Sequence, residues 1–411
     1  MKFAKRALAA LLSAAMMTCA FAGCGDSTAA SSAAASTKDA AASTAAASGD
    51  KVVKIGVYEP ASGDNGAGGK QETLGIQYAN KVQPTVEIGG ETYTVELDIV
   101  DNQSSTDKGP SAAQQLVSDG VSVVLGSYGS AVAIAAGDVF KNGKVPAIGV
   151  TCTNPQVTEG NDYYFRICFL DPFQGTVLAN FAHGDLSAKK AYCLSKQGDD
   201  YSAGVCNYFK EAFTKLGGEV VEEAFPDGNS DFTSYVTNAK NQGCDVFFAP
   251  VSIEAAANII KQAQAQGLEI PMLASDTWDS NVVAEAAKGT GMDIYVTTFY
   301  QEGGSPDFDS GIKEYINSDS TALANNGGND QLAAVSAMGY DAYFTALEAL
   351  KAAGSTDSEK VKEALPSVSY TGVTGTITFG ENGDANRTSA FIKKCNTETA
   401  AWDLVREQGV E

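Results

Sequence analysis

The feature that most constrains the fold is a repeated alternation of apolar strand patterns with amphipathic helix patterns. Continuous apolar runs at residues 121–125, 145–150 and 246–249 predict buried strands, and residues 205–216 show the apolar spacing of a helix. Continuous apolar strands separated by helices are typical of parallel sheets that are covered on both faces. The chain beyond residue 50 is too long for one such sheet. We therefore expect an α/β protein with two Rossmann-like lobes.

The N-terminus has the layout of an export signal. A short basic region precedes an apolar run over residues 7–22, which is too short and too rich in alanine for a stable membrane span. The run ends in Phe21-Ala22-Gly23-Cys24, which resembles the bacterial lipobox, although Phe21 replaces the usual leucine. We expect residues 1–23 to be removed as a signal peptide and Cys24 to carry a lipid. The alternative is plain secretion, with cleavage after an alanine such as Ala22.

The next segment has the composition of a linker. Residues 26–50 are almost entirely Ala, Ser, Thr and Gly, with no apolar periodicity. Such a composition buries too little apolar surface to offset the entropy of ordering. We expect residues 24–50 to form a disordered tether, so that a lipid on Cys24 holds the folded domain outside the cytoplasm at the cell membrane.

The charge and the cysteines exclude several classes of protein. Removal of residues 1–23, which hold three basic and no acidic residues, takes the formal net charge from −22 to −25. A chain this acidic is not expected to bind nucleic acid or to dock on anionic lipid through its charge. Two of the eight cysteines lie in the export region, and the other six form no CxxC pair. We predict no metal site and assign no disulfide.

A glycine-rich loop at residues 59–70 follows the first predicted strand and invites a nucleotide-binding interpretation. A Walker A loop that ends at Gly69-Lys70 would need glycine in place of Asp64 and Ser or Thr in place of Gln71. A GxGxxG motif that starts at Gly66 fails at Gln71 as well. We therefore expect no cofactor, and a loop that closes over a ligand or simply turns the chain.

Other strand ends carry the residues of a candidate binding site. Ligands of open parallel sheets bind at the carboxyl ends of the strands. Ser130 and Thr153 follow two strands of the first lobe, at helix starts whose hydroxyl and N–H donors suit a carboxylate. Each is alternatively an ordinary helix cap. Tyr201 and Asp276 follow two strands of the second lobe, and an acid facing such donors suits the ammonium of a zwitterion.

Several of these segments resemble type I periplasmic-binding proteins, and within them the branched-chain (Leu/Ile/Val) amino-acid receptors of ABC importers. The most specific segments are Leu125-Gly126-Ser127-Tyr128-Gly129-Ser130 and Gly149-Val150-Thr151-Cys152-Thr153-Asn154-Pro155-Gln156-Val157-Thr158. The resemblance extends from Lys51 to about Val405. It implies two lobes hinged around a central ligand cleft. Their implied bounds are 51–170 with 301–379 for lobe 1, and 171–300 with 380–411 for lobe 2.

The resemblance also implies the roles of individual residues. Ser130 and Thr153 would bind the ligand carboxylate, with help from backbone groups of Thr151 and Cys152. Tyr201 and Asp276 would bind from the second lobe, with Asp276 receiving the ammonium. Ser252 stands where the family has a tyrosine over the ligand, and the first-lobe cystine of the family is missing. A monomer of this kind would bind one small amino acid, branched-chain by resemblance, and deliver it to an ABC permease.

Three alternatives remain open. An enzyme would have to use the single histidine, His183, without any GxSxG motif, or the acids Asp199, Asp200 and Asp276 as a hydrolase pair. We predict that the chain is not an enzyme. A ligand sensor or co-receptor would have the same two lobes. A receptor for amides or other small carboxylates would differ only in the ligand.

Overall fold

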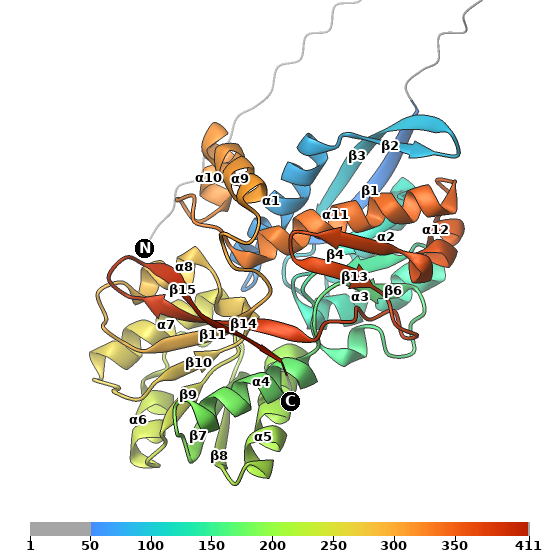
Figure 1. Ribbon diagram of the computed structural model, residues 1–411. Helices are drawn as coiled ribbons and strands as arrows, with labels where there is room; N and C mark the ends of the chain where they lie inside the picture. The colour runs from blue at the N-terminus through green and yellow to red at the C-terminus, as the bar shows by residue number, and fades with distance from the viewer. Residues whose placement is uncertain (1–50, 410–411) are drawn as a thin grey trace, which may run out of the picture. The chain divides into compact units, whose positions relative to one another are not determined.

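The computed structural model describes residues 51–409, which form two α/β lobes (Figure 1). The predicted signal peptide, the lipid-accepting Cys24 and the tether lie outside the described residues. Among residues 51–409, no helix is long and apolar enough to cross a membrane. The six cysteines of this part of the chain are all buried, and none forms a disulfide.

The first sheet has six strands in the order β2-β3-β1-β4-β5-β6. All neighbouring strands are parallel except β2 and β3, and β1 lies between β3 and β4. The residues of β1 from Ile55 to Tyr58 are all buried, which explains why that run lacks the alternation of polar and apolar residues. The strands are β1 (Val52–Glu59), β2 (Thr85–Ile88), β3 (Glu91–Asp101), β4 (Val123–Gly126), β5 (Ala147–Gly149) and β6 (Tyr164–Arg166).

The second sheet has seven strands in the order β15-β14-β11-β10-β9-β7-β8. The five strands from β11 to β8 are parallel, whereas β14 and β15 run antiparallel at one edge. The strands are β7 (Lys190–Lys196), β8 (Glu219–Phe225), β9 (Val246–Phe248), β10 (Met272–Ala274), β11 (Ile294–Thr298), β14 (Ser389–Asn396) and β15 (Ala401–Gly409).

Helices pack on both faces of each sheet, as the continuous apolar strands require (Figure 1). The longest, α11, is buried along most of its length between α1 and the first sheet. A short hairpin of β12 (Ser369–Gly372) and β13 (Gly375–Thr378) follows it. The helices are α1 (Gly66–Val82), α2 (Gly109–Asp119), α3 (Ser130–Gly143), α4 (Asp171–Gly184), α5 (Asp200–Lys215), α6 (Thr233–Asn241), α7 (Ile253–Ala265), α8 (Asn281–Ala287), α9 (Pro306–Ser318), α10 (Ser320–Asn325), α11 (Ala334–Ala353) and α12 (Ser358–Ala364). Three single 3₁₀ turns are η1 (Pro155–Val157), η2 (Asp276–Trp278) and η3 (Leu365–Ser367).

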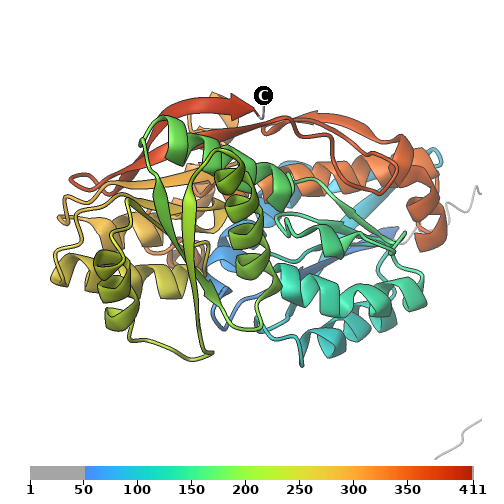
Figure 2. The same ribbon diagram turned by 90° about the horizontal axis from the view of Figure 1, so that it is seen from below.

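The α/β class with two lobes is confirmed, but the sheets are mixed rather than wholly parallel. At one edge, Gly89 and Gly90 both have positive φ, which allows a two-residue turn and an antiparallel β2–β3 hairpin. At the other, β14 and β15 reach the second sheet from the end of the chain. Figure 2 shows this red C-terminal segment passing between the lobes, and Asp384 within it contacts Arg166 of the first sheet.

Candidate ligand-binding site

Ser130 and Thr153 lie side by side at the ends of neighbouring strands. Ser130 is the first residue of α3, after the short loop that follows β4, and its hydroxyl oxygen accepts from the backbone N–H of Asn154 at 3.3 Å. Thr153 follows β5, and its buried hydroxyl makes no well-formed hydrogen bond among the described residues, although it lies close enough to the Asp171 carboxyl to favour the ionised form of that acid. Neither side chain makes a capping hydrogen bond, so the alternative that they are ordinary helix caps is wrong for both. Both hydroxyls are thus available to a ligand.

Thr151 and Cys152 contact the protein rather than the cleft with their side chains. The Thr151 hydroxyl donates to Glu72 Oε2 at 2.5 Å, and the Cys152 side chain is part of the apolar core behind the first sheet. The Cys152 carbonyl oxygen accepts from Arg166 at 3.0 Å. Only their remaining backbone groups are left for a ligand, which is the role that the family resemblance implies for them.

Arg166 is a site-supporting residue that the sequence analysis missed. It is fully buried in β6, and its guanidinium donates to Asp384 Oδ1 at 2.6 Å and to the carbonyl oxygens of Cys152 and Asn154 at 3.0 and 2.5 Å. It also donates to the Thr158 hydroxyl at 2.9 Å. These bonds fix the loop that presents Thr153. A lone arginine inside the apolar run at 164–169 was the signal in the sequence, because such a charge must be paired when buried.

Tyr201 and Asp276 meet in the second lobe. Asp276 opens η2 after β10, Tyr201 lies in the first turn of α5, and both are buried. The Tyr201 hydroxyl donates to Asp276 Oδ1 at 2.7 Å. Asp276 does not cap the following helix, because Ser280 caps α8 by accepting from the backbone N–H of Val282 at 3.2 Å. Asp276 keeps Oδ2 free of these bonds.

Ser252 and Asp199 both have structural bonds of their own. The Ser252 hydroxyl oxygen caps α7 by accepting from the backbone N–H of Ala255 at 3.3 Å. Asp199 caps α5 by accepting from Ser202 at 3.0 Å. The capping of α5 therefore accounts for Asp199 without the catalytic role that the hydrolase alternative would give it.

Hydrogen bonds between the lobes show that the cleft is closed. Tyr128 donates through its hydroxyl to the Thr277 carbonyl oxygen at 3.4 Å, and the Asn154 amide donates to the Asp200 carbonyl oxygen at 2.8 Å. Gln71 of α1 donates to Asn281 Oδ1 at 2.6 Å. A side chain on Gly68 would overlap the Tyr128 ring, so glycine is required for α1 to approach it. Closure removes Asp276, Thr153 and Ser130 from solvent together.

Burial makes the enclosed acids reluctant to ionise. It raises the pKa of Asp276 to about 6, against the opposing effect of the hydrogen bond from Tyr201. Burial likewise raises the pKa of Glu72 to about 7 and that of Asp171 to about 7, and the charge of Asp276 adds to both increases. Because the charge of Asp276 affects the pKa of both Glu72 and Asp171, the three carboxyls lie in one region. A cation that entered it would be strongly favoured, because it would offset the cost of the buried negative charge.

Binding of any ligand ammonium to Asp276 is expected to weaken in acid. Below pH 6 a growing share of the ligand-free protein holds Asp276 protonated, and a neutral carboxyl does not pair with an ammonium. Binding must then release a proton, so the affinity should fall by up to about tenfold per pH unit below about pH 6. Calorimetric titrations from pH 5 to pH 8 would measure this. The variant Asp276→Asn should lose the part of the pH dependence that comes from Asp276 and keep any part that comes from Glu72 and Asp171. A wild-type protein that binds with equal affinity at pH 5 and pH 7.5 would contradict the account.

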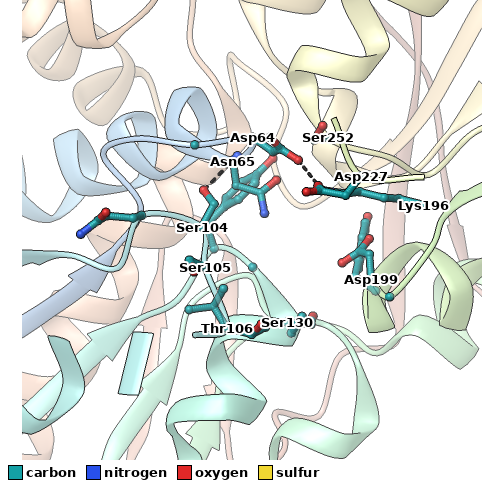
Figure 3. A pocket seen from close by; sticks show the side chains of 18 of the residues that line it. Asp64, Asn65, Ser104, Ser105, Thr106, Ser130, Lys196, Asp199, Asp227 and Ser252 are labelled. Carbon is teal, nitrogen blue, oxygen red and sulfur yellow. Dashed lines mark hydrogen bonds and ion pairs between the residues drawn. The ribbon is translucent and has the colours of Figure 1, made fainter. Parts of the chain in front are cut away.

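A cavity of about 400 Å³ adjoins these residues and receives side chains from both lobes (Figure 3). Ser130 of the first lobe and Tyr201 and Ser252 of the second lobe are among the residues that line it. The site residues predicted from sequence therefore fall into two groups. Thr151, Cys152, Thr153 and Asp276 belong to the buried centre, whereas Ser130, Tyr201 and Ser252 also face the cavity. Among residues 51–409, no group of three metal-ligating side chains is present.

Comparison with known proteins identifies the family to which this geometry belongs. The family model described as periplasmic binding protein matches residues 52–398. The chain belongs to the periplasmic binding protein family. Membership confirms the predicted resemblance, and it confirms that the protein is a binding protein rather than an enzyme.

Individual relatives are similar over nearly their whole length. The Leu/Ile/Val-binding protein homolog 1 of Brucella abortus is 30% identical over 339 residues, covering 82% of this chain and 87% of its own. The crystal structure of the leucine-binding protein LivK from Thermotoga maritima is 32% identical with a TM-score of 0.76, and the match covers 87% of this chain and 99% of LivK. LivJ from Streptococcus pneumoniae, solved with isoleucine, is 26% identical with a TM-score of 0.74, covering 88% and 99%. A Rhodopseudomonas palustris solute-binding protein in complex with benzoate shares the periplasmic-binding fold at 20% identity, with a TM-score of 0.75 and coverage of 87% and 96%.

Proposed function

We propose that the protein is the extracytoplasmic receptor of an ABC importer, which captures an α-amino acid between its lobes and delivers it to a membrane permease. The observation that carries this proposal is the closed cleft, in which the Asp276–Tyr201 pair and the unpartnered Thr153 hydroxyl are buried together. An α-amino acid carries one group for each side, an ammonium for the carboxylate and a carboxylate for the hydroxyl donors.

The two ends of the ligand would be held by different elements. Ser130 and Thr153, with backbone groups of Thr151 and Cys152, would bind the carboxylate at the start of α3 and the loop after β5. Asp276 would bind the ammonium, with Tyr201 fixing the orientation of the carboxylate. Hydrogen bonds to charged groups are the stronger kind, and exclusion of water by closure strengthens them further.

Relatedness favours a branched-chain side chain on that amino acid. The Brucella relatives are named Leu/Ile/Val-binding, LivK is described as leucine-binding, and LivJ was solved with isoleucine. The alternatives are amides or small carboxylates, of which the benzoate of the R. palustris protein is an example, and a sensor or co-receptor with the same lobes. The buried groups support a ligand that carries the ammonium and carboxylate of an α-amino acid, whichever side chain it has.

A thermal-shift screen tests this function. A soluble form that lacks residues 1–24 is screened against the twenty amino acids, related amides, and benzoate and hydroxybenzoates. A ligand that binds only the folded state raises the melting temperature by mass action. We expect at least one α-amino acid to raise it, with one site per chain in calorimetry and no chemical change of the ligand by chromatography. A response to aromatic acids alone, or conversion of the ligand, would reject the proposal.

We also propose that the receptor is a lipoprotein with residues 1–23 as signal peptide, Cys24 as lipid-bearing N-terminus and residues 24–50 as tether. Its lobes would be 51–170 with 301–379 and 171–300 with 380–411, monomeric in solution. The tether would let the receptor reach its permease without leaving the membrane.

Replacement of the lipid-accepting cysteine tests the anchor. In its host, the wild-type protein is expected in the membrane fraction, and Cys24→Ala is expected to release it or to block its processing. A Cys19→Ala variant is the matched control and should remain anchored. Mass spectrometry of a soluble, unacylated mature protein that starts at another residue would reject the anchor.

A further inference from the structure

The cavity that adjoins the amino-acid head is lined mainly by polar groups. Its first-lobe wall is formed by the loop after β1, which holds Asn65, and by Ser104, Ser105 and Thr106 after β3. Figure 3 shows these residues facing Lys196, Asp199 and Asp227 of the second lobe. Apart from two tyrosine rings, Ala131 and Val132 are its apolar contributions. An apolar side chain would meet more polar than apolar surface here.

Several of these polar groups have bonding capacity to spare. Within the described residues, the Asn65 side-chain amide and the Thr106 hydroxyl have no hydrogen-bond partner, although backbone N–H of Asn65 donates to Ser104 at 3.1 Å. Ser130 and Ser252 use their oxygens as acceptors, which leaves both hydroxyl hydrogens free to donate. A side chain without polar atoms would remove water from these groups and return no hydrogen bond.

The one lysine of the cavity is already paired with acids, and the two acids that it does not pair with are Asp199 and the solvent-exposed Asp107. Lys196 forms ion pairs with Asp64 across the cleft and with Asp227 at 2.7 Å, and Asp199 is held as the cap of α5. The lysine therefore has two acidic partners, which leaves no unpaired cation for an anionic side chain. The surplus of acids disfavours an anionic side chain further, and because Asp107 is exposed to water and Asp199 is bonded to Ser202, the groups best placed to bond a ligand are the neutral donors and acceptors.

We infer that the ligand carries a neutral, hydrogen-bonding side chain of the amide or hydroxyl class, and that this side chain occupies the cavity between Asn65, Thr106 and Ser252. The inference rests on the proposed amino-acid function and departs from the branched-chain side chain that relatedness favours. It assigns the selectivity of the receptor to side chains of both lobes, so that the preferred solute also bonds the lobes together.

Near-isosteric amino-acid pairs test the inference by calorimetry on the soluble form that lacks residues 1–24. Asparagine is compared with leucine and threonine with valine, and glutamine, glutamate and lysine are added. We expect the polar member of at least one pair to bind at least about tenfold tighter than its aliphatic partner, because a site built for hydrogen bonds rejects analogues that lack them. The variant Asn65→Leu should narrow that preference by about tenfold, whereas Asn207→Leu on the exposed face of α5 should leave it unchanged.

The outcomes separate the inference about the side chain from the proposed function. Leucine and valine both binding as tightly as their polar partners would overturn the inference and leave the proposed function standing. Tightest binding of glutamate or lysine would also overturn it. A preference unchanged by Asn65→Leu would overturn the placement of the side chain in this cavity. Binding of no amino acid by a folded protein would overturn the proposed function and the inference together.

Discussion

Replacing Asp276 with alanine is expected to weaken amino-acid binding by roughly two to four orders of magnitude. The ligand ammonium loses its water in the closed cleft, where Asp276 is only 2% exposed. Removing one partner of a buried, charge-assisted pair typically costs about 3–5 kcal/mol, because the other charge is left uncompensated. At about 1.4 kcal/mol per tenfold, that cost gives the stated loss of affinity, which isothermal titration calorimetry measures directly.

The ligand-free fold should tolerate this change. Burial raises the pKa of Asp276 to about 6, so its ionised form predominates at neutral pH but carries a desolvation cost, which removal of the side chain relieves while losing the bond from Tyr201. Asp200→Ala is the matched control, since Asp200 is an exposed acid beside the same cleft. We expect wild-type affinity from that variant. An Asp276→Ala protein with unchanged affinity and a lowered melting temperature would assign Asp276 a structural role only.

Replacing Arg166 with alanine is expected to cause the largest loss of stability. The change leaves the carbonyl oxygens of Cys152 and Asn154 without the arginine donor, and it leaves the carboxylate of Asp384 with the Thr158 hydroxyl but without its cation. Breaking a buried ion pair from one side costs about 3–5 kcal/mol. Because those carbonyls belong to the loop that presents Thr153, ligand affinity should fall as well. Urea unfolding gives the change in the free energy of unfolding.

A surface arginine provides the comparison. Arg406 forms an ion pair with Asp185 in which both side chains are about one-third exposed or more, 40% and 35%. Exposed pairs contribute little, so Arg406→Ala should lower the free energy of unfolding by about 1 kcal/mol or less. Similar losses from Arg166→Ala and Arg406→Ala would contradict the role given to Arg166.

Buried parallel strands were the most predictable part of the fold. The runs at 121–125, 145–150 and 246–249 became β4, β5 and β9, because strands covered on both faces must be apolar throughout. The antiparallel edges were less predictable. The half-exposed pattern of β15 carries no strong apolar signal, and its pairing with β14 depends on chain segments that return late to the second sheet.

The candidate site was predictable as far as strand ends determine it. Ser130, Thr153 and Asp276 each follow a strand, and the rule that ligands bind at the carboxyl ends of strands selects them. Glu72 was not predictable in this way, because it reaches Thr151 from the middle of α1. Hydrogen bonds that depend on lobe closure, such as that from Asn154 to Asp200, join residues that no local pattern connects.

The most direct test of the central claim is a calorimetric cycle that removes the ligand ammonium and its partner separately. The tightest-binding amino acid and its 2-hydroxy acid are titrated into the wild-type protein and into Asp276→Ala. If the two groups pair, each single change should lower the affinity by two or more orders of magnitude. The double change should lower the affinity far less than the product of the two single losses. A 2-hydroxy acid that binds wild-type protein as tightly as the amino acid, or losses that simply multiply, would contradict an α-amino-acid receptor centred on Asp276.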